Sequence, residues 1–265
     1  MKIFSLVITA LFLSQALFSQ IGGLSASKLY SQTAQTVDFK TVEFEPGFYH
    51  LRSNSYWDSD GKRQNIYSTP DSMRVVSGTY FRFTYGILPD LESGFTVSSD
   101  FSLLLFGLRY HFYHGNKSNL ALIAGAGWPM GNTTIDERVR STSNIPKIGG
   151  GLVWSYDFTN NLSIDATAEY MGFVKQTEHH DKGGVYLYGD LGYYFFNHQL
   201  QLIGAAAYQI TIDNHGSHRV FSLNPGITVE TGKHFIVVLS LPIDVTGRNE
   251  VKNTAFNFAL TIGID

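Results

Sequence analysis

Residues 104–128, LLFGLRYHFYHGNKSNLALIAGAGW, carry a pattern that recurs along the rest of the chain. In the first part, apolar side chains occupy alternate positions, at Leu104, Phe106, Leu108, Tyr110 and Phe112. In the second part, they do so at Leu120, Leu122, Ala124, Ala126 and Trp128. Because side chains alternate between the two faces of a strand, both parts are predicted to be β-strands with one apolar face. The Gly, Asn and Ser residues between them predict a tight turn, so the unit is a β-hairpin.

The two faces of this hairpin differ in chemistry. Each strand has about ten residues, the length that a tilted strand needs to cross the hydrocarbon core of a bilayer. The apolar face suits lipid, whereas the opposite face carries Gly107, Arg109 and His111 and suits a crowded or wet interior. Such a division is typical of a transmembrane β-barrel. A hairpin of a soluble sandwich gives the same local pattern, so the interpretation depends on repetition.

The pattern repeats from residue 41 to the end of the chain. About twelve alternating segments follow one another, an even number, as expected for a single-chain bacterial barrel. Short turns such as 88–90 and 197–199 mostly alternate with longer polar loops such as 53–73 and 131–146. We therefore predict an all-β fold, a transmembrane antiparallel up-and-down β-barrel of about twelve strands with periplasmic termini. An exported soluble β-sandwich or barrel is the alternative.

Three local features are predicted within this barrel. Pro46 removes one donor from the strand ladder and predicts a β-bulge there. Tyr56 and Trp57 fall in the polar loop after the first strand, where aromatic side chains would suit partner binding. Residues 235–245, FIVVLSLPIDV, predict the eleventh strand.

Composition supports a membrane barrel. Charged residues make up 15% of the chain, against about 25% in a typical soluble domain. Aromatic residues reach 14%, and there are 26 glycines. The net charge of −3 does not indicate a nucleic-acid partner. Since the sequence has no cysteine, a lipoprotein anchor, a disulfide scaffold and a thiolate metal site are excluded.

The first residues, MKIFSLVITALFLSQALFSQ, resemble a secretory signal. Lys2 supplies the positive charge, and the apolar run 3–13 is too short for a membrane-spanning helix. We expect residues 1–19 to be a signal peptide that is removed, residues 20–40 to be a lead-in or a segment inside the lumen, and residues 41–265 to be the barrel. Export to the outer membrane of a Gram-negative bacterium follows, with outer-membrane lipid as a partner.

The inward faces of the predicted strands collect most of the ionisable side chains. These candidate lumen-lining residues are Glu43, Glu45, Arg82, Glu92, Arg109, His111, Lys147, Asp157, Asp165, Glu169, Asp190 and Asp244. In one interpretation they line a narrow polar conduit for a small-molecule solute, and their acidic excess favours cations or neutral solutes. In the other they pair across strands, for example Arg82 with Glu45 or Glu92, and fill the interior.

Enzymatic function finds little support in the sequence. His179, His180 and Asp181 lie in a predicted extracellular loop and are the local candidates for a rim hydrolase or a weak metal site, although a solvated loop explains them as well. There is no G-x-S-x-G, phosphate-binding loop or H-E-x-x-H element. No catalytic residue, cofactor or metal centre is assigned. A channel is the leading hypothesis, and an outer-membrane enzyme and a structural or adhesive barrel are the alternatives.

Two segments carry a resemblance to a known family. They are residues 24–49, LSASKLYSQTAQTVDFKTVEFEPGFY, and residues 81–97, FRFTYGILPDLESGFTV. The elements SASKL, EFEP and YGI-x-x-x-LE-x-G are similar to those of a Gram-negative outer-membrane family, the "putative MetA-pathway of phenol degradation" family, which is related to barrels that pass fatty acids and aromatic hydrocarbons. The resemblance implies passage of small, often hydrophobic, molecules. It supplies no catalytic or binding motif.

Overall fold

The computed structural model describes residues 21–25, 28–69, 72–130, 146–174, 183–212, 217–231 and 235–264. The predicted signal peptide and the loop residues His179, His180 and Asp181 lie outside this described part. No helix in the described residues is long and apolar enough to span a membrane.

The described residues form fourteen β-strands. They are β1 (Val42–Trp57), β2 (Arg63–Asn65), β3 (Arg74–Leu88), β4 (Leu91–Ser98), β5 (Leu103–His114), β6 (Ser118–Pro129), β7 (Lys147–Asp157), β8 (Leu162–Phe173), β9 (Gly183–Phe195), β10 (Leu200–Ile212), β11 (Ser217–Glu230), β12 (Phe235–Ser240), β13 (Ile243–Arg248) and β14 (Glu250–Ile264).

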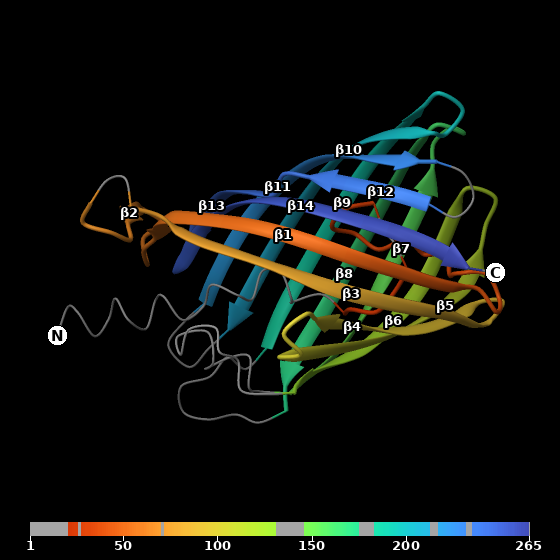
Figure 1. The fold of residues 1–265 in the computed structure, drawn as a ribbon, viewed down its shortest axis with the longest axis horizontal. Helices are drawn as coiled ribbons and strands as arrows, with labels where there is room; N and C mark the ends of the chain where they lie inside the picture. Colours follow the sequence, from red (N-terminus) through yellow and green to blue (C-terminus); the bar gives the residue numbers. More distant parts are fainter. Residues whose placement is uncertain are drawn as a thin grey trace.

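Sequential antiparallel pairing closes these strands into a barrel (Figure 1). Strand β14 pairs with β1 from Val42↔Ile264 to Trp57↔Glu250, which removes the free sheet edges. The short β2 pairs with the end of β1, beyond the part of β1 that pairs with β3. Strands β12 and β13 follow one another between β11 and β14. The wall therefore has twelve strand positions, and the predicted all-β antiparallel barrel is confirmed.

Burial alternates along the strands as the sequence pattern predicts. In β9, Tyr186 and Tyr188 are buried inside the barrel, while Leu187 and Leu191 are exposed on its outer surface. Apolar side chains of other strands, such as Phe106, Leu122 and Ile148, are exposed in the same way. A large apolar outer surface around a partly polar interior is the arrangement that a bilayer requires.

Two local predictions for β1 are wrong. The register stays constant on both sides of Pro46, so there is no bulge at this proline; the register with β14 shifts between Ser53 and Ser55 instead. The missing Pro46 donor interrupts the ladder without an extra residue. Tyr56 and Trp57 belong to β1 because pairing with β14 continues beyond the last residue paired with β3. The ring of Trp57 is buried against the Cα of Gly247, where a Cβ would lie 2.4 Å from it.

The predicted strand 235–245 is interrupted and also longer than expected. Pro242 has no amide hydrogen, and the wall is irregular at Leu241 and Pro242, between β12 and β13. Two hydrogen bonds carry the pairing across this point, from Leu241 N to Pro225 O and from Ala255 N to Pro242 O. Strand β13 then continues to Arg248.

Residues 21–25 and 28–40 run through the barrel interior, and we call them the lumen segment (Figure 1, red). This segment contains no regular strand, and Ile21, Leu24 and Ala34 are almost completely buried. Gly107 allows its close approach to the wall, since a Cβ there would lie 2.3 Å from the carbonyl oxygen of Gly22. The barrel interior is thus packed around an irregular segment whose backbone groups are not paired in a strand.

Candidate functional site

The lumen segment is held by polar side chains of the barrel wall. An irregular chain inside a barrel must find partners for its amide groups, because unpaired buried N–H groups are costly. The carboxylate of Glu92 in β4 accepts hydrogen bonds from Ser25 N (2.8 Å), Ser25 Oγ (2.8 Å) and Val37 N (2.7 Å). A single buried carboxylate therefore joins two separate parts of the segment to the wall.

Arg109 in β5 completes this attachment. Its guanidinium lies 2.7 Å from Glu92 Oε1, and both side chains are fully buried. It also donates to Thr33 O (2.8 Å) and to Ser25 Oγ. Charge-assisted hydrogen bonds of this kind are stronger than neutral ones. The pair formed by Arg109 and Glu92 is thus the central anchor of the lumen segment.

Acidic residues on β8 and β9 hold the segment from another side of the lumen. Lys28 forms an ion pair with Asp165. The carboxylate of Asp190 accepts from Leu29 N (2.6 Å) and Tyr30 N (2.7 Å), and Glu169 accepts from Ile21 N (3.2 Å). Since β4 and β5 are separated from β8 and β9 by β6 and β7, these contacts stretch the segment across the lumen.

A second arginine binds the wall and the segment together. Arg82 lies 2.8 Å from Glu45 Oε2 and 3.5 Å from Glu43 Oε2, and it donates to Leu24 O. Thr261 Oγ1 donates to Glu45 at 2.5 Å, so this cluster spans the closing strands β1 and β14.

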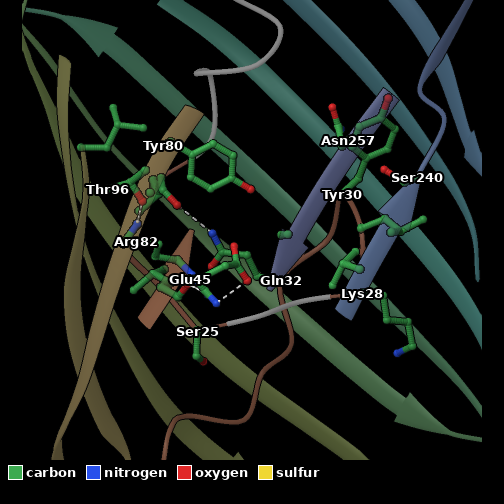
Figure 2. Close-up of a pocket in the computed structure, with 18 of the residues that line it drawn as sticks. Ser25, Lys28, Tyr30, Gln32, Glu45, Tyr80, Arg82, Thr96, Ser240 and Asn257 are labelled. Carbon is green, nitrogen blue, oxygen red and sulfur yellow. Dashed lines mark hydrogen bonds and ion pairs between the residues drawn. The ribbon is translucent and has the colours of Figure 1, made fainter. Parts of the chain in front are cut away.

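An interior cavity of about 230 Å³ lies beside this cluster, between the lumen segment and mainly strands β1, β3, β12 and β14 (Figure 2). Its lining mixes the aromatic side chains of Tyr30, Tyr49 and Tyr80 with polar groups. In Figure 2, Gln32 from the lumen segment and Asn257 from β14 are among the residues that surround it. Burial raises the pKa of the Tyr30 hydroxyl, and Asp244 and Asp190 raise it further, so this group stays neutral.

Several polar atoms around this cavity lack partners. Among the described residues, Gln32 Oε1, Arg82 Nε and Asn257 Oδ1 are buried without a hydrogen bond. All three side chains line the cavity, and they offer two acceptors and one donor. Buried polar atoms of this kind are normally satisfied by water or by a bound molecule. The cavity can therefore receive a small molecule that has both an apolar body and a polar group.

The structure places the candidate lumen residues as follows. Buried in the interior are Glu45, Arg82, Glu92, Arg109, Asp165, Glu169, Asp190 and Asp244. Partly buried are Glu43, His111 and Lys147, and Asp157 is exposed at the end of β7. Asp244 bonds to Ser222 Oγ (2.6 Å) and Asn253 N (2.8 Å) within the wall. The other buried acids mainly contact the lumen segment or an arginine, and the predicted preference for cations stays a prediction.

The cavity is not predicted by the sequence pattern. Its tyrosines come from the lumen segment and from inward positions of β1, β3 and β9, which the alternation marks only as inward. Glu45 and Arg82 of its lining are among the predicted lumen-lining residues, whereas Gln32 and Asn257 carry no charge and give no signal above that of an ordinary polar residue.

Solved outer-membrane barrels share this fold. The COG4313 outer membrane channel from Pseudomonas putida F1 is similar with a TM-score of 0.70 and 11% identity, over 91% of this chain and 100% of that chain. The NanC porin matches with a TM-score of 0.55 and 8% identity, over 83% of this chain and 98% of that chain. The KdgM porin matches with a TM-score of 0.50 and 10% identity, over 83% and 99% of the two chains. At these identities the likeness concerns the fold alone.

At the level of sequence, no curated protein matches the chain. A family model does match, over residues 72–260, which include every barrel strand from β3 to β13 and most of β14. The resemblance noted in the sequence is thus confirmed. The chain belongs to the family described as "Putative MetA-pathway of phenol degradation".

Proposed function

We propose that this protein is an outer-membrane channel for small, aromatic or otherwise hydrophobic molecules. The interior cavity beside the lumen segment is the main support for this function. It lies inside a closed barrel that has an apolar outer surface. A cavity of about 150 Å³ can hold benzene, so one of about 230 Å³ has room for a single-ring aromatic molecule.

The lining of the cavity supports a solute with mixed character. Tyrosine rings and apolar residues such as Leu105 and Val238 suit a ring or an alkyl chain. Gln32, Arg82 and Asn257 suit a hydroxyl or carbonyl group on that solute. The family to which the chain belongs and the similarity to the COG4313 outer membrane channel agree with this role.

The proposed setting is the outer membrane of a Gram-negative bacterium, reached with a signal peptide that is cleaved. In this setting, both ends of the described barrel, the start of β1 and the end of β14, face the periplasm. The connections at this end are short, as in the β3–β4 and β9–β10 turns. Lipid surrounds the exposed apolar side chains.

Uptake into proteoliposomes tests the proposed solute class. The refolded protein should accelerate entry of a single-ring phenol more than entry of a sugar of similar size, relative to empty liposomes. Tyr80→Ala should change the rate for the phenol, because this ring lines the cavity. Equal acceleration of both solutes would contradict a hydrophobic solute class, and no acceleration of either would contradict a channel.

A further inference from the structure

A second group of side chains lies at the rim of the barrel, away from the cavity. Asp90 is in the turn between β3 and β4, and His111 and His114 are in the last part of β5. This is the rim where β1 begins and β14 ends, since Val42 pairs with both Tyr85 and Ile264. One oxygen or nitrogen atom from each of the three side chains lies within 4.8 Å of the others.

From this arrangement, we propose that Asp90, His111 and His114 bind one divalent transition-metal ion, with Zn²⁺ as the fitting case. The nearest atoms are His114 Nε2 and Asp90 Oδ1 at 2.9 Å, and His111 Nδ1 and His114 Nε2 at 3.3 Å. In a tetrahedral zinc site with bonds of about 2.0–2.1 Å, neighbouring ligand atoms are about 3.3 Å apart. These two separations are thus close to the one that a tetrahedral ion requires, and the ligand atoms of Asp90 and His111 lie within 4.8 Å of each other.

The strand geometry explains why these two histidines share a site. Residues three apart on a regular strand point to opposite faces. The register of β5 with β6 shifts between His111 and Tyr113, because Phe112 is an extra residue in this ladder. His111 therefore pairs with Ala121 and His114 with Asn119, two positions on the same face of β6. The bulge places both rings on one side of the wall, with their centroids 3.7 Å apart.

Asn119 gives His111 the orientation of a metal ligand. Its Oδ1 lies 3.2 Å from His111 Nε2, and the Asn119 side chain is buried. This hydrogen bond favours the tautomer of His111 that carries its proton on Nε2. In this tautomer, Nδ1 has a free lone pair, which points at His114. A hydrogen bond from the distal nitrogen of a metal-binding histidine to such an acceptor is the usual support around a metal. The amide of His111 also donates to Asp90 O at 2.9 Å, which fixes the turn against β5.

Two imidazole nitrogens and one carboxylate oxygen suit zinc and related late first-row ions. Without an ion, one proton on His114 Nε2 satisfies the same three atoms through hydrogen bonds. On binding, Zn²⁺ forms bonds with His111 Nδ1, His114 Nε2 and Asp90 Oδ1. A protonated His114 then releases its Nε2 proton to solvent and keeps the proton on Nδ1, so it remains a neutral imidazole ligand. His114 and Asp90 are 44% and 47% exposed, so water can reach the fourth position.

Calorimetric titration of the metal-free, refolded protein with zinc chloride tests this site. The wild type should bind one zinc ion per protein chain. The variants His114→Gln and Asp90→Asn should each lose this binding. Asn119→Ala should retain the site and weaken it by about 10- to 100-fold, as expected for a supporting residue. Heat-modifiable migration on gels verifies that each variant has a folded barrel.

Controls separate this site from other histidines. His198→Asn changes an exposed histidine in the β9–β10 turn at the same rim, next to Tyr194, and should keep the zinc binding. A variant with His179→Gln and His180→Gln should keep it as well. The proposal fails if the wild type binds no zinc, or if the two ligand variants bind as the wild type does. It also fails if the His179 and His180 variant loses the zinc binding.

Discussion

Arg109 and Glu92 show how charge inside a barrel can serve a segment of the same chain. Both are fully buried, and together they contact Ser25, Thr33 and Val37. Removal of one partner from such a pair leaves a buried charge and typically costs about 3–5 kcal/mol. Their inward direction could be predicted from strand alternation. Their partners could not, because residues 21–40 have no pattern that fixes their position.

Adding a single methyl group at Gly107 tests how closely the lumen segment packs against β5. The Cβ of Gly107→Ala would lie 2.3 Å from Gly22 O and 2.8 Å from Leu24 Cγ, so the segment must shift. We expect a loss of about 1–3 kcal/mol in the free energy of unfolding, as for an overpacked core. The same variant should make the segment more susceptible to protease.

Gly204→Ala is the matched control for this change. Gly204 is also in the barrel wall, and a Cβ there would have no atom within 4 Å. Urea unfolding and limited proteolysis of both variants provide the comparison. If Gly107→Ala behaves like Gly204→Ala in both measurements, the close packing of the segment against β5 is contradicted.

At the scale of elements, alternation predicted the existence and order of the wall strands, and it failed where the ladder is irregular. Pro46 suggested a bulge but only interrupts pairing, whereas Pro242, which divides a strand, and Phe112, which forms a bulge, were not singled out. The outcome at each depends on neighbouring strands that are distant in the sequence. For the same reason, the position of His114 beside His111 could not be predicted from their spacing.

The β1–β2 hairpin beyond the wall should respond to acid through Asp58. Its carboxylate accepts from Asp60 N and Lys62 N at 2.9 Å and from Gln64 Nε2 at 3.1 Å. The hydrogen bond from Lys62, followed by that from Gln64, lowers the pKa of Asp58. Because the folded form has the lower pKa, this stabilisation is present above about pH 3.9, the unperturbed value, and is lost as pH falls through the folded pKa.

NMR titration of the Lys62 amide gives this pKa directly. Its chemical shift should change with a midpoint below that of an unperturbed aspartate, and Asp58→Asn should remove the transition. A midpoint at or above the unperturbed value would contradict the hydrogen-bonded hairpin.

For the whole molecule, the sequence predicted the class of fold, the number of wall strands and the family, and the structure and the family match confirm them. These follow from a pattern repeated in every strand, so errors in single segments do not affect them. The cavity could not be predicted, since it arises where the lumen segment leaves space beside β1, β3, β12 and β14. Its shape depends on contacts between segments that alternation alone does not relate.

We propose that a channel runs through this barrel and that the lumen segment restricts it. The most direct test is single-channel conductance in planar bilayers of the refolded barrel, with residues 21–40 present and deleted. We predict small discrete steps with the segment present and clearly larger steps after deletion, because the deleted chain crosses the lumen between β4 and β9. Equal steps for the two proteins would contradict restriction by the segment, and insertion of both without conductance would contradict the channel.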